Sequence, residues 1–188
     1  MQMFLIVRMH RMLAMNSTCR FYYSKKPYAL NLLIMLIGEV LIFYFVLILF
    51  GIDFIVLSLV VTLEVMILIL FGITPLLTYH EILNDQLVLR VGWIFRGNIP
   101  IANIESVERI EKGPIRTGVF FRLNRPELFI TSRSYDLIGI KLREKQRFLW
   151  ALGKKANKII FDVLDTDALV DLLETHLKST HASRVQVF

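Results

Sequence analysis

Two long apolar runs dominate the hydropathy pattern of this chain. The first covers residues 29–50, where only Asn31 and Glu39 carry strongly polar side chains, and the second covers residues 54–76. Each run has at least the roughly 20 residues that an α-helix needs to cross a hydrocarbon layer about 30 Å thick. Only a short break separates them, which leaves room for nothing but a reversal of direction. The pattern therefore predicts a transmembrane helical hairpin across residues 28–77.

After the hairpin the pattern changes to short alternations of apolar and polar residues. Such segments are typical of β-strands, and residues that favour turns separate them at close spacing. Asn84-Asp85 is a predicted tight turn, and residues 153–157 a predicted polar turn. We expect about seven or eight strands. The β-rich segments are residues 77–83, 87–91, 93–100, 106–110, 120–123, 128–131, 137–142, 148–152 and 159–164.

The last predicted element is an amphipathic helix. Leu169, Leu173 and Leu177 lie on one apolar stripe, and Asp165 or Thr166 is placed to cap the first turn. The expected fold class is therefore α+β in a membrane protein. In this prediction the hairpin precedes a small antiparallel β-barrel or bent sandwich, and the helix covers one open end.

These elements divide the chain into four parts. They are a basic N-terminal segment of residues 1–27, the hairpin of residues 28–77, a β-rich domain of residues 78–180 and a polar tail of residues 181–188. The first twenty residues are expected to be loosely ordered rather than an interfacial amphipathic helix. The aromatic and basic residues that follow them, up to Tyr28, are typical of the headgroup layer where a span begins.

The net charge of +6 is unevenly distributed along the chain. The N-terminal segment carries five Lys or Arg residues and no acid, and the hairpin turn carries only Asp53. From Thr78 onward, seventeen Lys or Arg residues face thirteen Asp or Glu residues. Cationic segments beside membrane spans stay on the cytoplasmic side. We therefore expect a multi-pass protein of the inner (cytoplasmic) membrane, with both termini in the cytoplasm.

Two carboxyl groups interrupt the apolar runs. Glu39 and Glu64 stand at similar distances from the hairpin turn, so an antiparallel hairpin places both near the middle of the bilayer. A charged carboxylate there is costly, and each is expected to be protonated, paired or turned towards protein. One interpretation is a proton or cation site. The other, which we favour, is a structural pair of neutral acids that hydrogen-bond between helices.

The basic residues of the β-rich domain are candidates for binding an anionic membrane surface or a partner. Cationic side chains contribute about 1 kcal/mol each where they reach an anionic leaflet. The alternative is an ordinary solvated surface balanced by Glu111, Glu127 and Glu144. The first group, residues 112–133, surrounds two loops. The second, residues 141–147, surrounds a turn. A third set lies at residues 154–158. The candidates in the first two groups are Lys112, Arg116, Arg122, Arg125, Arg133, Lys141, Arg143, Lys145 and Arg147.

The sequence offers no arrangement typical of catalysis. The single cysteine, Cys19, excludes an internal disulfide, and no Cys or His residues stand at zinc-finger spacing. No phosphate-binding glycine loop, nucleophile elbow or His-Glu-x-x-His motif is present. His80 is interpreted as a polar residue at a strand start rather than a pH-sensitive contact. We expect no enzyme activity, no cofactor, no metal and no nucleic-acid binding.

Two stretches carry a resemblance to a known family. Residues 80–110, HEILNDQLVLRVGWIFRGNIPIANIESVERI, resemble the opening of the bacterial and archaeal pleckstrin-homology-like (bacterial PH) domains of membrane proteins. Gly92 and the spacing of Ile101, Ile104 and Val107 fit that pattern. Residues 159–177, IIFDVLDTDALVDLLETHL, resemble the family's final strand, capped turn and C-terminal helix. Residues 113–133 are longer and more basic than the family pattern.

The resemblance implies a PH-like domain behind two spans and permits self-association into rings or larger assemblies. Eukaryotic PH domains hold phosphoinositides with a basic loop between their first two strands, but residues 83–86 contain no Lys or Arg. We therefore expect a non-catalytic scaffold that binds a protein partner, a second copy or anionic lipid headgroups. The principal alternative is a small transport or proton-sensing component that uses Glu39 and Glu64. A ligand sensor using the domain interior is a third, weaker hypothesis.

Overall fold

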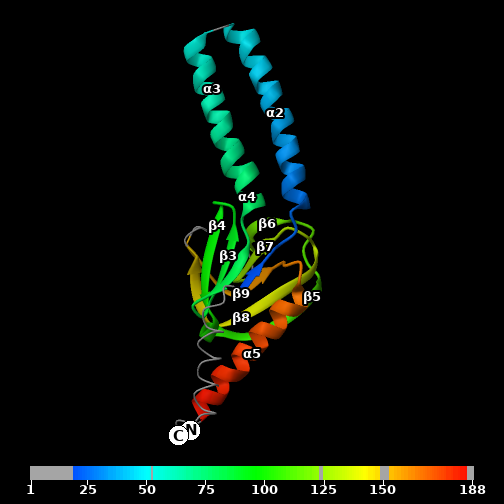
Figure 1. Cartoon of the computed structure of the whole chain (residues 1–188), viewed down its shortest axis with the longest axis vertical. Helices are drawn as coiled ribbons and strands as arrows, with labels where there is room; N and C mark the ends of the chain where they lie inside the picture. Colours follow the sequence, from blue (N-terminus) through cyan, green and yellow to red (C-terminus); the bar gives the residue numbers. More distant parts are fainter. Residues whose placement is uncertain (1–18, 52, 123–124, 149–152, 186–188) are drawn as a thin grey trace, which may run out of the picture.

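The computed structural model describes residues 19–51, 53–122, 125–148 and 153–185. The hairpin consists of α2 (Lys26–Phe50) and a second, composite helix (Figure 1). The composite helix runs through α3 (Phe54–Ile67), the π-helical segment η1 (Leu68–Ile73) and α4 (Thr74–Leu77). Both helices are long and apolar enough to cross a membrane, each with a mean hydropathy of 2.9. The two predicted helices are confirmed.

Particular residues determine where the second helix begins and where its form changes. Asp53 caps its start, because its Oδ1 atom accepts hydrogen bonds from the amides of Ile55 at 2.9 Å and Val56 at 3.3 Å. Near its exit, Pro75 has no amide to donate within the helix, and the backbone widens into the π-helical turn just before it. Gly72 in that turn is buried against the side chain of Leu32 on α2.

The first sheet contains strands from both sides of the hairpin. Its order is β1 (Cys19–Phe21), β2 (His80–Leu83), β3 (Gln86–Val91) and β4 (Phe95–Pro100), all antiparallel. β1 precedes the hairpin and β2 follows it, so the membrane segment is an insertion between two neighbouring strands. The expectation of loose order is wrong at Cys19 and Arg20, and Phe21, expected in the headgroup layer, is the third residue of this strand. Residues 1–18, for which loose order was expected, lie outside the described residues.

The second sheet contains β5 (Ile104–Lys112), β6 (Gly118–Phe121), β7 (Glu127–Thr131), β8 (Tyr135–Phe148) and β9 (Lys154–Phe161). Their order is β5-β8-β9-β7-β6. β7 pairs with β9 in parallel, so the expectation of an entirely antiparallel domain is wrong at this pair. The β6–β7 hairpin is the long, basic stretch that departs from the family pattern, and it extends the sheet by two strands.

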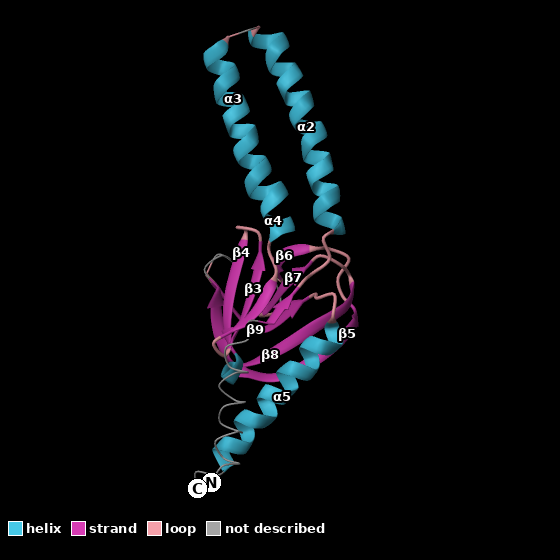
Figure 2. Ribbon diagram, viewed as in Figure 1, coloured by secondary structure: helices cyan, strands magenta, loops and turns pink. Residues whose placement is uncertain are grey.

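The two sheets pack face to face and do not join into a closed barrel within the described residues (Figure 2). The core between them unites Leu87, Phe95 and Ile99 of the first sheet with Ile140 and Phe148 of the second. The η2 turn (Ile101–Asn103) connects the sheets. The fold is thus α+β with two sheets, as far as the described chain extends.

The C-terminal helix α5 (Thr166–Val185) packs against β5, η2 and β8. Leu169 and Leu173 are completely buried, which confirms the predicted apolar stripe. Asp165 supports the first turn, because its Oδ1 atom accepts a hydrogen bond of 3.2 Å from the Ala168 amide. The helix continues to Val185 and so extends into residues 181–188, which the sequence assigns to a polar tail.

Two predicted turns had different outcomes. Asn84 and Asp85 have φ angles of 49° and 57° and join β2 to β3, which confirms the tight turn. The polar turn predicted at residues 153–157 is wrong beyond Gly153, because Lys154 already begins β9. Adjacent polar residues at the start of that strand, exposed at Lys154 and Lys155, resemble a turn in the sequence. The end of the strand predicted at residues 148–152 lies outside the described residues.

Candidate functional site

The two membrane glutamates interact across the hairpin. Glu39 on α2 and Glu64 on α3 are half-buried, and they lie close enough for their carboxyl groups to repel each other electrostatically. In each, Oε1 is buried without a hydrogen-bond partner among the described residues. Glu39 and Glu64 therefore stand on neighbouring helices of the hairpin, each with one enclosed carboxyl oxygen, and their depth in a bilayer stays a prediction. The structure contains no hydrogen bond that would join the two acids into the structural pair that we favoured.

The basic residues predicted as one group separate into two environments. Lys112, Arg122 and Arg125 line one hollow on the outer face of the second sheet, with a volume of about 410 Å³. Lys158 of β9 also lines it, although it belongs to a different group in the sequence. Four cationic side chains thus line one hollow because β5, β8, β9, β7 and β6 follow one another across the sheet and share its outer face.

Aromatic side chains form part of the wall of this hollow. Phe120 of β6 and Phe129 of β7 face each other in register, and their rings stack with centroids 4.9 Å apart and an interplanar angle of 6°. The Arg116 guanidinium lies over the Phe120 ring, 5.0 Å from its centroid. The outer face of the sheet is therefore apolar at its centre and cationic around it.

A buried carboxylate holds two of the cations loosely. Glu127 begins β7, and its side chain is 12% exposed. It lies 3.3 Å from Arg122 and 3.9 Å from Arg125, whose side chains remain 57% and 66% exposed. The turn is anchored underneath, since the Asn157 amide donates to the Pro126 carbonyl at 3.0 Å. Pro126 is therefore held against β9, while the guanidinium groups of Arg122 and Arg125 reach solvent.

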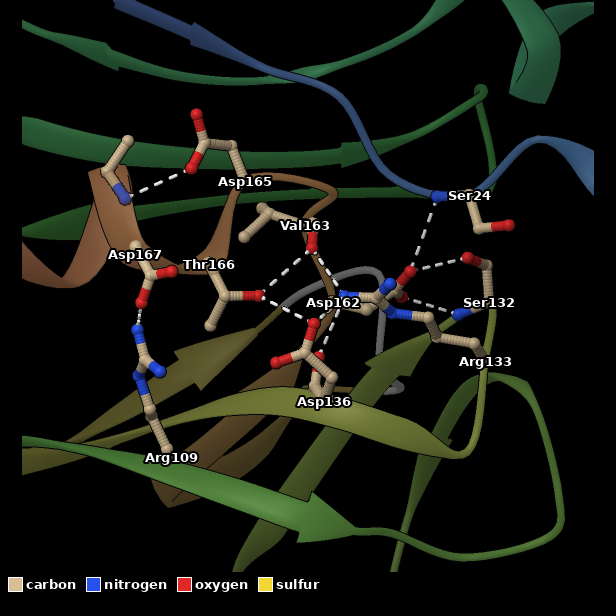
Figure 3. Close-up of polar contacts among 11 residues, drawn as sticks. Ser24, Arg109, Ser132, Arg133, Asp136, Asp162, Val163, Asp165, Thr166 and Asp167 are labelled. Carbon is tan, nitrogen blue, oxygen red and sulfur yellow. Dashed lines mark hydrogen bonds and ion pairs between the residues drawn. The ribbon is translucent and has the colours of Figure 1, made fainter.

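Arg133 does not belong to this surface. Its side chain is only 14% exposed, and its Nη2 atom donates to the Asp136 carboxylate at 2.7 Å and the Val163 carbonyl at 2.6 Å (Figure 3). Thr166 at the start of α5 donates to the same carboxylate at 3.0 Å. Arg133 therefore connects the start of β8 to the loop before α5, which is a structural role.

The second predicted basic group is spread along β8. Arg143, Lys145 and Arg147 line a separate polar hollow of about 810 Å³ together with residues of β4 and η2. Lys141 forms an ion pair of 3.0 Å with Glu105 on the neighbouring strand. Arg147 Nε donates to the Gly153 carbonyl at 2.9 Å. These cations lie on a different surface from Lys112, Arg122 and Arg125.

A buried polar network, which the sequence pattern did not predict, lies where the domain meets the hairpin. The Tyr23 hydroxyl donates to the Pro75 carbonyl at 2.6 Å and lies 2.7 Å from the Thr78 hydroxyl. The Lys25 ammonium also donates to Pro75, at 3.0 Å, and to the Thr78 carbonyl. Tyr23 is 1% exposed, so its assignment to the headgroup layer is wrong. Its position in an aromatic and basic run gave no sign of this.

His80 and Asp162 extend this network into the domain. The His80 Nδ1 atom accepts a hydrogen bond of 3.2 Å from the Arg90 amide, and its ring lies 5.0 Å from that of Tyr23. Burial lowers the pKa of His80 to about 3, and the Lys25 charge acts in the same direction. Burial likewise lowers the pKa of Lys25 to about 8. The expectation that His80 is merely a polar residue at a strand start is incomplete, because it is fully enclosed.

Asp162 connects three segments that are distant in the sequence. Its carboxylate accepts hydrogen bonds from the Ser132 amide at 2.6 Å, the Ser132 hydroxyl at 2.5 Å and the Ser24 amide at 3.4 Å (Figure 3). Burial raises the pKa of this carboxyl, and the hydrogen bonds from Ser132 oppose that rise. The network thus attaches the end of β9 to the residues that lead into α2.

Comparison of the chain with protein-family models, curated proteins and solved structures finds no match. The resemblance to bacterial PH domains therefore depends on the residue pattern described above. The structure agrees with this pattern in its general arrangement: two helices that fit membrane spans are followed by a β-sheet domain.

Proposed function

We propose that this chain is a membrane-anchored, non-catalytic protein whose PH-like domain presents a cytoplasmic binding surface. The surface would bind a protein partner, a second copy or anionic lipid. The observation that carries the proposal is the insertion of the hairpin between β1 and β2, two paired strands of one sheet. A domain attached on both sides of its anchor is held at a defined height and orientation, which suits presentation of a surface.

The exposure of the hairpin supports its place in a bilayer. Large apolar side chains cover its outside, including Val40 at 68%, Ile55 at 83% and Leu59 at 72% exposure. A soluble monomer seldom exposes a contiguous apolar surface of this extent. The cationic flanks and the acidic turn favour cytoplasmic termini in the inner membrane.

The arrangement of the domain supports the PH-like assignment in outline. Two packed sheets with four strands in the first, followed by a C-terminal helix, agree with the pattern that the resemblance implies. The β6–β7 hairpin and its parallel pairing with β9 are departures from that pattern. We propose that this inserted hairpin is the part of the domain that has acquired its own binding role.

Topology can be mapped with single cysteines. In a Cys19→Ser background, Asp53→Cys and Lys155→Cys are labelled with a membrane-impermeant maleimide in right-side-out and inside-out vesicles. Asp53→Cys should react only from outside, and Lys155→Cys only from the cytoplasmic side. The reverse pattern would overturn the assignment of sides.

The binding role can be tested by cross-linking in the native membrane. A photo-activated cross-linker is placed at Arg116, and captured species are identified by mass spectrometry. A cross-linker at exposed Asp171 on α5 is the matched control. Capture of one distinct protein, the same chain or anionic lipid at Arg116 alone would support the proposal. Identical products at both positions would contradict it.

A transport or proton-sensing function is the second candidate, and the buried Oε1 atoms of Glu39 and Glu64, which have no hydrogen-bond partner among the described residues, favour it. The Glu39→Gln/Glu64→Gln variant separates the two functions. A scaffold keeps its captured partners, whereas a proton pathway loses proton flux in reconstituted vesicles. Flux in the unmodified protein that disappears in the variant would replace the scaffold proposal.

A further inference from the structure

We propose that the hollow between β5, β9 and the β6–β7 hairpin binds the phosphate headgroup of an anionic membrane lipid. This inference depends on the proposed membrane anchoring and names the ligand class of the domain's surface. Its volume of about 410 Å³ lies within the range of about 300–1,000 Å³ that is usual for small-molecule sites.

The charges of the hollow select an anion. Lys112, Arg122, Arg125 and Lys158 line it, and Glu127 is the one carboxylate among its described lining residues. Glu127 is shared between two arginines at 3.3 and 3.9 Å, distances that leave both guanidinium groups free to turn towards a ligand. Arginine forks match phosphate oxygens with paired hydrogen bonds, and a lysine adds a point charge.

Lys112 is the cation best placed to accept a new partner. It ends β5, its side chain is exposed, and its ammonium group forms no hydrogen bond or ion pair within the described chain. Lys158, in contrast, is paired with Glu108 on β5. The next residue, Gly113, is held by a hydrogen bond of 2.7 Å from its amide to the Ser134 carbonyl. The position of Lys112 is therefore set by the backbone.

The apolar part of the hollow selects an amphiphile rather than a free anion. The stacked rings of Phe120 and Phe129, together with Ile110 and Ile160, lie beside the cations. This combination suits a phosphate ester with an attached apolar group. Inorganic phosphate alone has no apolar group that could contact this part of the hollow.

The Lys112 end of the hollow lies towards the hairpin, which favours a lipid as the source of that ester. Arg122 and Arg125 line its other end, where Glu127 pairs with Lys158. The Lys112 end lies at the strand ends where Lys112 pairs with Tyr135 and Gly118 pairs with Thr131. Ser132 follows at the same edge and is joined through Asp162 to Ser24, just before α2. This edge of the sheet is therefore the one from which the hairpin rises, and Figure 1 shows β6 and β7 at the hairpin end of the domain.

The test uses the full chain in nanodiscs of phosphatidylcholine with or without phosphatidylglycerol. Native mass spectrometry then measures the lipid that the released protein retains. We expect retention of phosphatidylglycerol over phosphatidylcholine. The Lys112→Gln/Arg125→Gln variant should lose about 25-fold in this preference, because each cation near an anionic surface contributes about a factor of five. Both side chains are exposed, so the fold should persist, which an unchanged melting temperature would verify.

Two further variants sharpen the result. Lys141→Gln/Lys145→Gln removes the same charge from β8 outside the hollow and should retain the preference. Glu127→Gln removes the competing carboxylate and should strengthen binding. An equal loss in the β8 variant, or no preference in the unmodified protein, would overturn the inference. Retention of inorganic phosphate in place of phosphatidylglycerol would also overturn it. If cysteine mapping still gave cytoplasmic termini, the failure would concern the hollow and not the anchoring.

Discussion

Gly92 joins the β-rich domain to the base of the hairpin, and its replacement by alanine tests that connection. Gly92 follows β3 with a φ angle of 54°, a conformation that costs an L-residue about 1–2 kcal/mol. A Cβ atom there would lie 2.7 Å from Thr74 Oγ1 and 3.0 Å from both Cγ and the backbone nitrogen of Pro75. Because Pro75 is part of α4, relief of this contact requires the hairpin to move relative to the sheet.

The expected loss in the free energy of unfolding is the sum of the backbone strain and the steric contact. Overpacking against rigid neighbours costs about 1–3 kcal/mol, so Gly92→Ala should destabilise the chain by about 3 kcal/mol in all. For a chain of this size each kcal/mol lowers the melting temperature by about 2–4 °C. We therefore expect a decrease of about 9 °C in detergent micelles, measured by scanning fluorimetry.

Gly153→Ala is the matched control for this prediction. Gly153 also has a positive φ, 67°, but a Cβ atom there would meet only the flexible Arg147 side chain, at 3.0 Å. It therefore carries the backbone strain without the contact with the hairpin, and it should lower the melting temperature by about 4 °C. Equal decreases in the two variants would refute the claim that Gly92 determines how closely the domain packs on the hairpin.

Two further predictions concern the buried network at the same junction. Tyr23→Phe removes the hydroxyl that donates to Pro75 at 2.6 Å and should cost about 1–2 kcal/mol in thermal unfolding, whereas exposed Tyr22→Phe should cost almost nothing. The pKa of His80 falls from 6.5 to about 3 on burial, so its protonation favours the unfolded state. Stability should therefore be full above pH 6.5 and decrease as the pH falls towards 3, more in the native chain than in His80→Gln.

The neighbouring groups allow the His80 contribution to be isolated between pH 7 and 5. Lys25 has its pKa lowered from 10.5 to about 8, so its contribution to stability changes only above that window. The raised pKa of Asp162 acts in the opposite direction, since protonation of this carboxyl as the pH falls stabilises the folded state. Asp162 is present in both chains that are compared. Identical pH profiles for the native chain and His80→Gln would contradict the prediction, and a larger loss for Tyr22→Phe than for Tyr23→Phe would contradict the first.

The helices were predictable because their signals are local. The apolar runs directly predict two long helices joined by a short turn, and the leucine stripe of α5 predicts one buried face. The tight turn at Asn84-Asp85 was predictable for the same reason, because only a few residue types accept positive φ angles. In each case the residues that form the element also contain the information that specifies it.

The features that were missed depend on contacts between distant residues. Nothing in Cys19–Phe21 indicates a strand until β2 is beside it, and its three residues are too few for an alternation to be visible. The parallel pairing of β7 with β9 joins Glu127 to Lys158 across 31 positions of the chain, and this pairing brings Lys158 into the hollow. The burial of Arg133 also depends on such contacts. Its guanidinium turns inward because the Asp136 carboxylate and the Val163 carbonyl accept its hydrogen bonds.

The connections between the first sheet and the hairpin are short, so a movement of the helices acts directly on the sheet. Four residues separate β1 from α2, and two separate α4 from β2. At about 3.5 Å per extended residue, these links span at most about 14 and 7 Å. The bonds from Tyr23 and Lys25 to Pro75 shorten the available reach further. Glu39 lies on α2 and Glu64 on α3. A change in the packing of these two helices must therefore move β1 relative to β2, or the hydrogen bonds between β1 and β2 must resist it. The same rigidity keeps the cationic hollow at a constant distance from the hairpin, which a flexible tether would not do.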